Sequence, residues 1–382
     1  MEVPKVAVVT PGSFVIPSGR SSSVERVVEK MSPLAAKQLD IRIYGLADIR
    51  LPAVGSVGGI PCYRLPGGKR YVPSILRHLR AWRPDTVDVH NRPLLAYRLK
   101  ARLPFARVFL TLHSTTFIAC TPRMSEARLF RMLDSVDGLI VNSLFLKEEL
   151  LRRFPDLKTK ITVNPLGVSL DDFVPRWTPY GESLRQARLK DLGWEDRKIV
   201  LFIGRLLPSK GVHHLLRAWE KIMQREPAAM LLIVGSAFYG NDRETRYAKS
   251  LKKMAKPFGA RVVFLPFVPY PKVADWYNLA DVVVVPSGDE EAFGLVNVEA
   301  MASAVPVIAT KAGGIPEIVK HGDSGFLLSE DELGRNLAAR VLYLLEHEEE
   351  RKRMGQAGFD MARGKFRWQH TADRWVSLIK EG

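Results

Sequence analysis

The chain has 382 residues, of which 46% are hydrophobic and 26% charged, and its formal net charge at pH 7 is +16. This composition excludes a disordered or fibrous protein, and the length exceeds what one hydrophobic core usually supports, so two domains are expected. The excess positive charge predicts an anionic partner, such as a nucleic acid, an anionic membrane surface or a phosphorylated small molecule.

The two cysteines, Cys62 and Cys120, lie far apart in the sequence and have no cluster of metal-binding residues near them. Neither a disulfide framework nor a zinc site is therefore indicated. The first apolar run is too short for a signal peptide, and no stretch approaches the ~18 apolar residues of a membrane span. A cytoplasmic protein is expected.

Short runs rich in β-branched residues alternate with longer helical patterns, which predicts βαβ units and parallel sheets. Strands are expected at 5–12, 40–46, 85–91, 107–114, 137–143 and 160–167 in the first half, and at 198–205, 229–236, 261–268, 281–287 and 306–310 in the second. The pattern predicts two doubly wound, Rossmann-like α/β domains that face each other across a cleft, because ligands of such sheets bind beyond the carboxyl ends of the strands.

The domain boundaries follow from composition. The segment 167–197 is rich in charge, Pro and Gly, so it reads as a linker followed by a helix. The first domain is expected at 1–170 and the second at 171–360. The segment 366–382 contains Trp368 and Trp375 and is expected to form an amphipathic helix.

One stretch of the first domain is strongly basic. Ten Lys and Arg residues lie between Lys69 and Arg107, against two acids, Asp85 and Asp88. We interpret this stretch as a candidate docking face for an anionic partner. The alternative is an ordinary solvated helix surface.

Arg205 and Lys210 lie five residues apart at the end of a predicted strand, just before a helical pattern that contains His213 and His214. Two cations beside a helix N-terminus suit a pyrophosphate, because Arg offers a fork of donors, Lys a point charge and the helix free N–H groups. The alternative is a pair of surface cations beside a turn. The two histidines are interpreted as structural.

Glu291 and Glu299 lie eight positions apart around a helix expected to begin near Gly294, whose missing side chain allows a close approach to a ligand. Carboxylates repel phosphates, so beside a bound diphosphate they would serve hydroxyl groups of a sugar or ribose. The alternative is that Glu299 is an acid in the N-terminal turn, favoured there by the helix dipole, and that Glu291 lies in a solvated loop.

Together with "GGIPEIV" (313–319) and "GDSGFLL" (322–328), these motifs resemble the family 4 retaining glycosyltransferases, which have the GT-B fold. The similarity covers nearly the whole chain and is strongest over 198–328. The chain looks most similar to the spore-coat or surface-polysaccharide branch. The resemblance also implies that a C-terminal helix within 361–382 crosses back to the first domain.

The resemblance implies a role for each of several residues of the second domain. These are Glu299 on the nucleotide ribose, Glu291 and the backbone of Phe293, Gly294 and Leu295 on the donor sugar and phosphates, Arg205 and Lys210 on the leaving diphosphate, and Phe267 and Val268 at the base.

In the first domain, the resemblance places His113 against the donor hexose, and His90 and Asn91 are expected on the acceptor side. The alternative for His113 is a satisfied polar residue at a strand end. The family's Gly-Gly turn after the first strand is replaced here by Gly19 followed by serines at 21–23, which could donate hydrogen bonds to the donor instead.

The implied reaction replaces the phosphate at the anomeric carbon with retained configuration and needs no protein nucleophile. The donor is a nucleotide diphosphate sugar, with a UDP-sugar slightly favoured, and the acceptor is a glycan, a lipid-linked molecule or a small molecule. No cofactor and no metal are expected, since the chain lacks the Asp-x-Asp triplet of GT-A enzymes. Peripheral association with an anionic membrane is a further hypothesis.

Other functions remain as alternatives. A glycoside hydrolase also uses two carboxylates, but needs no adjacent cationic loop. A phosphorylase or epimerase with the GT-B fold, or a non-catalytic coat or scaffold protein, would fit the same architecture. Only the positive charge suggests a nucleic-acid binder. Because no recognised nucleic-acid-binding motif is present, no nucleic acid is expected as a partner.

Overall fold

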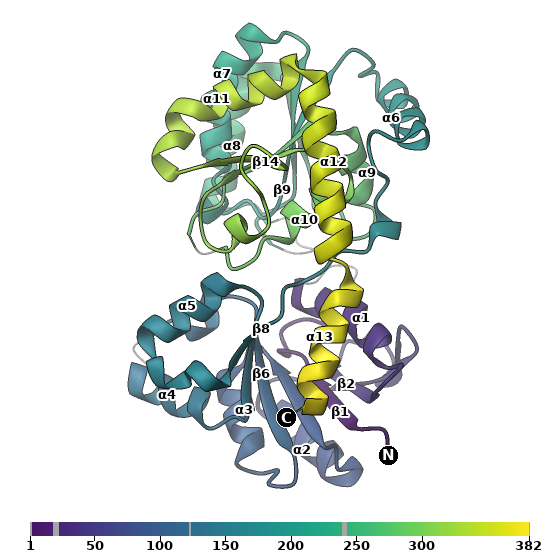
Figure 1. Ribbon diagram of the computed structural model, residues 1–382, viewed down its shortest axis with the longest axis vertical. Coiled ribbons are helices and arrows are strands. Elements are labelled where there is room, and N and C mark those ends of the chain that lie inside the picture. The colour runs from purple at the N-terminus through teal and green to yellow at the C-terminus, as the bar shows by residue number, and fades with distance from the viewer. Residues whose placement is uncertain (1, 18–22, 122–123, 239–242, 290, 382) are drawn as a thin grey trace. The chain divides into compact units, whose positions relative to one another are not determined.

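The computed structural model describes residues 2–17, 23–121, 124–238, 243–289 and 291–381. The chain forms two compact units. Unit 1 comprises Met1–Leu166 and Trp368–Gly382, and unit 2 comprises Gly167–Arg367 (Figure 1).

Unit 1 is built around an eight-stranded sheet with the order β3-β4-β2-β1-β5-β6-β7-β8, in which only the β3–β4 pair is antiparallel. Its strands are β1 (Lys5–Val9), β2 (Asp40–Leu46), β3 (Val54–Val57), β4 (Ile60–Leu65), β5 (Thr86–His90), β6 (Arg107–Leu112), β7 (Gly138–Val141) and β8 (Ile161–Val163). Its helices are α1 (Ser23–Ala35), α2 (Tyr71–Trp82), α3 (Pro93–Lys100), α4 (Glu126–Asp134), α5 (Leu144–Arg153) and α13 (Trp368–Glu381).

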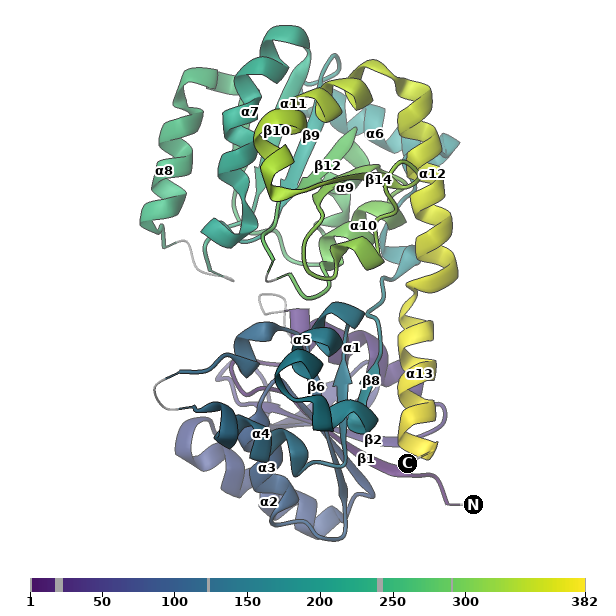
Figure 2. The same ribbon diagram turned by 60° about the vertical axis from the view of Figure 1, so that its left-hand side comes forward.

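The last helix of the chain belongs to the core of unit 1. In Figures 1 and 2, α13 is the yellow helix beside β1 and β2, and its Trp375 and Ile379 are buried in one cluster with Val28 and Met31 of α1. Covering a parallel sheet on both faces explains why β1 is almost continuously apolar. The segment 366–382 therefore forms the expected helix, and it packs on the first unit.

Unit 2 contains a fully parallel six-stranded sheet with the order β11-β10-β9-β12-β13-β14. Its strands are β9 (Lys198–Ile203), β10 (Ala229–Val234), β11 (Val262–Leu265), β12 (Val282–Val285), β13 (Val307–Thr310) and β14 (Gly325–Leu328). Its helices are α6 (Pro179–Leu192), α7 (Val212–Arg225), α8 (Arg246–Ala255), α9 (Ala274–Leu279), α10 (Leu295–Ala302), α11 (Glu330–Glu346) and α12 (Glu348–Lys365). Renumbered within the unit, the order is 3-2-1-4-5-6, that of dinucleotide-binding sheets, and the switch point lies between β9 and β12.

The predicted architecture of two doubly wound units is confirmed, and each predicted strand overlaps an observed one. Three strands were not predicted: β3 and β4 at the edge of unit 1, and β14 at the edge of unit 2. The boundaries also differ in detail. Unit 1 ends at Leu166 rather than 170, and the returning segment begins at Trp368 rather than 361, because α12 continues to Lys365.

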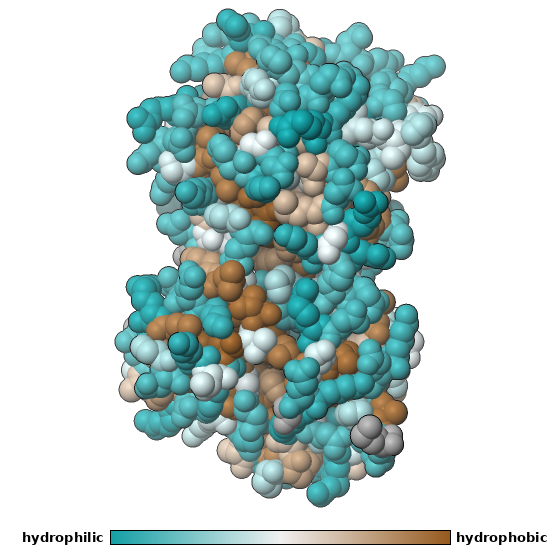
Figure 3. All heavy atoms as spheres, in the orientation of Figure 1, coloured by the Kyte–Doolittle hydropathy of each residue, from teal (hydrophilic) through white to brown (hydrophobic). Residues whose placement is uncertain are grey.

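The surface agrees with the composition. Figure 3 shows hydrophilic side chains over most of the face that it draws, with hydrophobic ones in smaller patches. Within the part of the chain that the structure describes, none of the helices is both long and apolar enough to cross a bilayer.

Candidate active site

Two loops of unit 2 meet at the switch point of its sheet. Gly288 N donates a 2.9 Å hydrogen bond to Ser209 O, which joins the loop after β12 to the loop after β9. Gly211 has φ +69°, and a Cβ atom there would lie 1.9 Å from Pro286 O. Only glycine fits this position, because the backbone is left-handed and the neighbouring loop is in contact. The strand ends thus place the two loops side by side.

Across this junction, Lys210 and Glu291 form an ion pair, with Lys210 Nζ donating to Glu291 Oε2. The side chains remain 23% and 20% exposed, so solvent reaches both. Two of the residues selected from the sequence therefore come together from loops that are far apart along the chain. Their charges offset each other in the free protein.

A third loop, after β13, holds the backbone of Glu291. Gly314 N donates a 2.9 Å hydrogen bond to Glu291 O, and a Cβ atom at Gly313 would lie 2.1 Å from that oxygen. Gly294, with φ +88°, begins α10 and lies close enough that its Cβ atom would be 3.4 Å from Glu291 Cγ. Glu291 is thus fixed by the loops after β9, β12 and β13, beside the N-terminus of a helix whose first N–H groups have no carbonyl partner within the helix.

Glu299 lies on α10 and is 5% exposed. Its Oε2 accepts a 2.7 Å hydrogen bond from the hydroxyl of Tyr277 on α9. Tyr270 is nearby, and its pKa is raised, first by burial, then by Asp172, with a smaller contribution from Glu299. The carboxylate is therefore oriented by its own domain. Sequence reasoning missed Tyr277, since a buried tyrosine in a short helix carries no distinguishing pattern.

The other predicted residues of unit 2 have different surroundings. Arg205 lies two residues after the end of β9 and is exposed, while Phe293 and Leu295 are buried. The Phe293 ring lies 6.1 Å from that of Phe366, so its side chain packs within the unit and only its backbone is suited to a ligand. Phe267 and Val268 follow β11 and are half-buried. Val268 also lines a cavity of about 350 Å³ together with Trp276 and Leu279. Gly19 lies outside the described residues.

In unit 1, His90 and His113 meet at the carboxyl ends of the neighbouring strands β5 and β6. Their rings are stacked with centroids 5.2 Å apart, and His90 Nδ1 lies 3.0 Å from His113 Nε2. His113 N donates a 2.8 Å hydrogen bond to Asn91 Oδ1. The three polar residues selected from the sequence thus form one cluster.

Behind this cluster, Asp88 is completely buried and accepts hydrogen bonds from Thr111 Oγ1 at 2.7 Å and from Trp375 Nε1 at 2.8 Å. His90 Nε2 lies 3.5 Å from Asp88 Oδ2, which favours the tautomer with its proton on Nε2. His90 Nδ1 then accepts a hydrogen bond from His113. Burial and the neighbouring His90 hold the pKa of His113 well below its usual value, so His113 is neutral near pH 7. The sequence offered Asp88 only as an acid in a basic stretch.

Metal-binding side chains do not gather in the described ranges, where no group of three or more His, Cys, Asp or Glu residues is positioned to hold an ion.

The chain is similar to known proteins over its whole length. The family model described as "Glycosyltransferase Family 4" matches residues 24–172, and the one described as "Glycosyl transferases group 1" matches 185–361. Spore coat protein SA of Bacillus subtilis is 30% identical over 377 residues, which are 99% of each chain. The lipopolysaccharide 1,2-N-acetylglucosaminetransferase of Salmonella typhimurium is 27% identical over 78% of this chain and 72% of its own.

Solved structures share the fold. Sucrose-phosphate synthase from Thermosynechococcus elongatus aligns with a TM-score of 0.80 at 22% identity, covering 99% of this chain and 98% of the other. Anabaena HepE in complex with UDP-glucose aligns with a TM-score of 0.79 at 20% identity, covering 99% and 100%. By its two matching family models and its full-length relatives, the chain belongs to the GT-B glycosyltransferases of family 4 and is an enzyme of that class.

Proposed function

We propose that this glycosyltransferase moves a sugar from a nucleotide diphosphate sugar to an acceptor, with retention of configuration and without a metal or cofactor. The donor belongs to unit 2 and the acceptor to unit 1. The observation that carries the proposal is the Lys210–Glu291 pair at the switch point between β9 and β12. HepE, a structural neighbour, is known in complex with UDP-glucose, which supports a UDP-sugar as the donor.

The ion pair suits a site that exchanges partners when the donor arrives. A diphosphate carries more negative charge than one carboxylate, so it attracts the ammonium group of Lys210 more strongly than Glu291 does. Charge-assisted hydrogen bonds to phosphate are strong. Glu291 is then released to accept hydrogen bonds from sugar hydroxyls. Arg205 and the N-terminus of α10 supply further positive charge for the diphosphate.

In the reaction, the bond between the anomeric carbon and the phosphate oxygen breaks while the acceptor oxygen bonds to the same face of that carbon. The departing phosphate oxygen takes the acceptor's proton. The protein contributes position and electrostatic stabilisation of the leaving group. The acceptor is a glycan, a lipid-linked molecule or a small molecule, and the relative named as a lipopolysaccharide 1,2-N-acetylglucosaminetransferase supports a role in synthesis of a cell-surface polysaccharide.

Glu299 provides the ribose contact in this proposal. Its Oε2 is already bonded to Tyr277, which fixes the carboxylate plane. Ribose hydroxyls that donate to the carboxylate would meet a charged, desolvated acceptor, where such bonds are strong.

The donor can be identified by thermal shift against UDP, GDP, ADP, TDP and their sugars, because a ligand that binds only the folded state raises its stability. We expect one nucleotide to raise the melting temperature, UDP first among them. Glu299→Ala should abolish that shift, while the exposed Glu349→Ala on α12 should leave it unchanged. A full response from Glu299→Ala would place the ribose elsewhere.

Retention and metal independence are tested on the same protein. The anomeric configuration of the first product, read by NMR, should equal that of the donor. Activity should persist in excess chelator. A dependence of turnover on inorganic phosphate, or conversion of the donor without an acceptor, would instead indicate a phosphorylase or an epimerase.

A further inference from the structure

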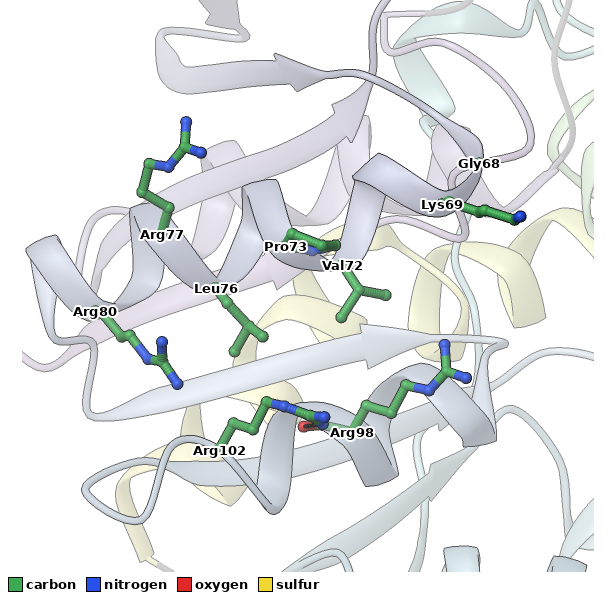
Figure 4. A pocket seen from close by; sticks show the side chains of 9 residues that line it. All are labelled: Gly68, Lys69, Val72, Pro73, Leu76, Arg77, Arg80, Arg98 and Arg102. Carbon is green, nitrogen blue, oxygen red and sulfur yellow. Dashed lines mark hydrogen bonds between the residues drawn. The ribbon is translucent and has the colours of Figure 1, made fainter.

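A groove in unit 1 is lined by cations of two helices and of the turn before them. Its volume is about 710 Å³, and it is lined by Gly68, Lys69, Val72, Pro73, Leu76, Arg77, Arg80, Arg98 and Arg102. Figure 4 shows Val72, Leu76 and Arg80 reaching from α2 toward α3, which carries Arg98 in its last turn and is followed by Arg102. The lining thus combines an apolar strip with positive charge.

The charge of this groove is not compensated within the described chain. Lys69 and the four arginines are exposed, and none of them is paired with a carboxylate of a described residue. Neither α2 nor α3 contains an acidic residue. The exposed helix α12 differs, since its Lys352 and Arg353 pair with glutamates one turn away. The positive charge of the groove is therefore available to an external anion.

We infer that this groove is a docking site for the surface of an anionic lipid bilayer, with lipid phosphates on the arginines and the accessible apolar side chains Val72 and Pro73 against the adjoining apolar parts of the lipids. This inference concerns where the enzyme works and does not depend on the donor chemistry proposed above.

The spacing of the cations favours a surface over one soluble anion. Lys69 lies in the turn before α2 and Arg80 in its last turn, eleven residues or about 16 Å apart at the rise of a helix, so the basic side chains extend well beyond the reach of one phosphate. A bilayer presents many phosphates in a plane and fits such a row. The groove lining has no aromatic residue for bases to stack on, so a single-stranded nucleic acid fits less well.

The test is co-sedimentation of the full-length protein with phosphatidylcholine vesicles, with and without phosphatidylglycerol, at low and physiological salt. We expect binding only to the anionic vesicles, weakened by salt because the contacts are electrostatic. Replacing Arg77, Arg80, Arg98 and Arg102 by Gln should weaken binding by about a hundredfold or more, since each cation near an anionic surface strengthens binding about fivefold.

A matched control variant separates the contribution of the groove to vesicle binding from that of the protein's net charge. It replaces Lys37, Lys158, Lys253 and Lys256 by Gln, which removes the same formal charge from exposed positions outside the groove. This control should bind anionic vesicles nearly as the parent does. Equal weakening of both variants would overturn the inference, and so would equal binding of the parent to neutral and anionic vesicles.

Two further measurements exclude other anions and misfolding. Saturating glycerol phosphate should not displace the protein from vesicles, and a random DNA duplex should not bind better than the vesicles; either result would overturn the assignment to a bilayer. The groove variant should keep the thermal shift given by the nucleotide donor, because its substitutions lie in unit 1. Loss of vesicle binding with that shift intact supports the groove whatever the donor proves to be.

Discussion

Gly211 is the residue at which two loops of the candidate active site touch. Its left-handed backbone excludes most side chains, and the carbonyl of Pro286 occupies the space that a Cβ atom would need. A backbone oxygen cannot rotate aside as a flexible side chain can. The close approach of these loops, and with it the Lys210–Glu291 pair, therefore depends on a missing methyl group.

We predict that Gly211→Ala destabilises the protein by about 3 kcal/mol, the sum of a left-handed alanine and a steric clash. Gly193→Ala is the matched control, because Gly193 has φ +66° with no atom near its would-be Cβ, and it should cost about 1 kcal/mol. Urea unfolding followed by circular dichroism measures both. Equal costs would show that the loops are not in contact as described.

For the Lys210–Glu291 ion pair, we predict a small effect on stability and a large effect on catalysis. Both side chains are partly exposed, so Lys210→Gln should change the free energy of unfolding by less than about 1 kcal/mol. If Lys210 stabilises the departing diphosphate, the same change should lower kcat by about a hundredfold or more. Steady-state kinetics with the identified donor measures this. Lys320→Gln removes a surface cation paired with Asp323 and should leave kcat unchanged.

Among individual residues, those that act through their charge could be predicted from the sequence. Lys210 and Glu291 were selected because their types suit a diphosphate and a sugar, and the structure brings them together. Tyr277 and Asp88 were not selected. Their importance depends on which buried neighbour they contact, and that contact joins residues far apart along the chain.

Among the elements, α7 carries a titrating pair in its first turn. The pKa of His213 is lowered to about 4 by burial, with smaller contributions from His214 and Arg217. His213 Nδ1 also lies 2.8 Å from the hydroxyl of Tyr247. The N-terminus of a helix disfavours a cation as well. The structural role predicted for this residue agrees with these contacts.

The pH dependence of stability follows from this shift. Between pH 6.5 and 4, an unfolded His213 binds a proton that the folded one does not, so stability should fall as the pH falls through this range. We predict a smaller fall for His213→Gln, and a smaller one still when His214, whose pKa is also lowered by burial, is changed as well. Urea midpoints at pH 7.5 and pH 5 measure it. Identical slopes for all three proteins would contradict the assignment.

Elements differed in how well the sequence specified them. Central strands such as β9 and β12 were predicted because burial on both faces leaves a continuous apolar run. The edge strand β3, with the sequence VGSV, is short, half-exposed and interrupted by glycine, so it resembles a loop. The local signal for the hairpin it forms with β4 is the pair Gly58-Gly59, both with positive φ, which is typical of a two-residue turn and was not used in the prediction.

At the scale of the whole molecule, the chain passes from unit 1 to unit 2 at Leu166 and returns at Trp368. The expectation that a final helix returns came from family resemblance, since its amphipathic pattern indicated burial but named no partner. The partners are now specific. Arg374 Nε donates to Asn164 Oδ1 at 3.0 Å, and Trp375 Nε1 donates to Asp88. The end of the sequence thus completes the interior of the unit that its beginning forms.

Removing this helix should therefore destabilise unit 1 selectively. A chain ending at Arg367 would expose the core surface covered by Trp375, Val376 and Ile379, at about 2 kcal/mol for each side chain, against a total domain stability of about 5–15 kcal/mol. Asp88 would also lose its indole donor in a buried site, which adds a further cost. The loops proposed to bind the donor lie in unit 2 and contain none of these contacts.

Peptide-resolved hydrogen exchange can separate the two units in one experiment. For the truncated chain we predict rapid exchange across 1–166 and continued protection of 198–328, where the nucleotide donor should still slow exchange. Lys380→Ala is the control within α13, because it removes only an exposed hydrogen bond to Gln38 and should leave both units protected. If 1–166 stayed protected without α13, the burial of Trp375 would contribute little to the fold. If protection vanished everywhere, the stability of unit 2 would depend on a folded unit 1, and the contacts within unit 2 would not be sufficient to keep it folded.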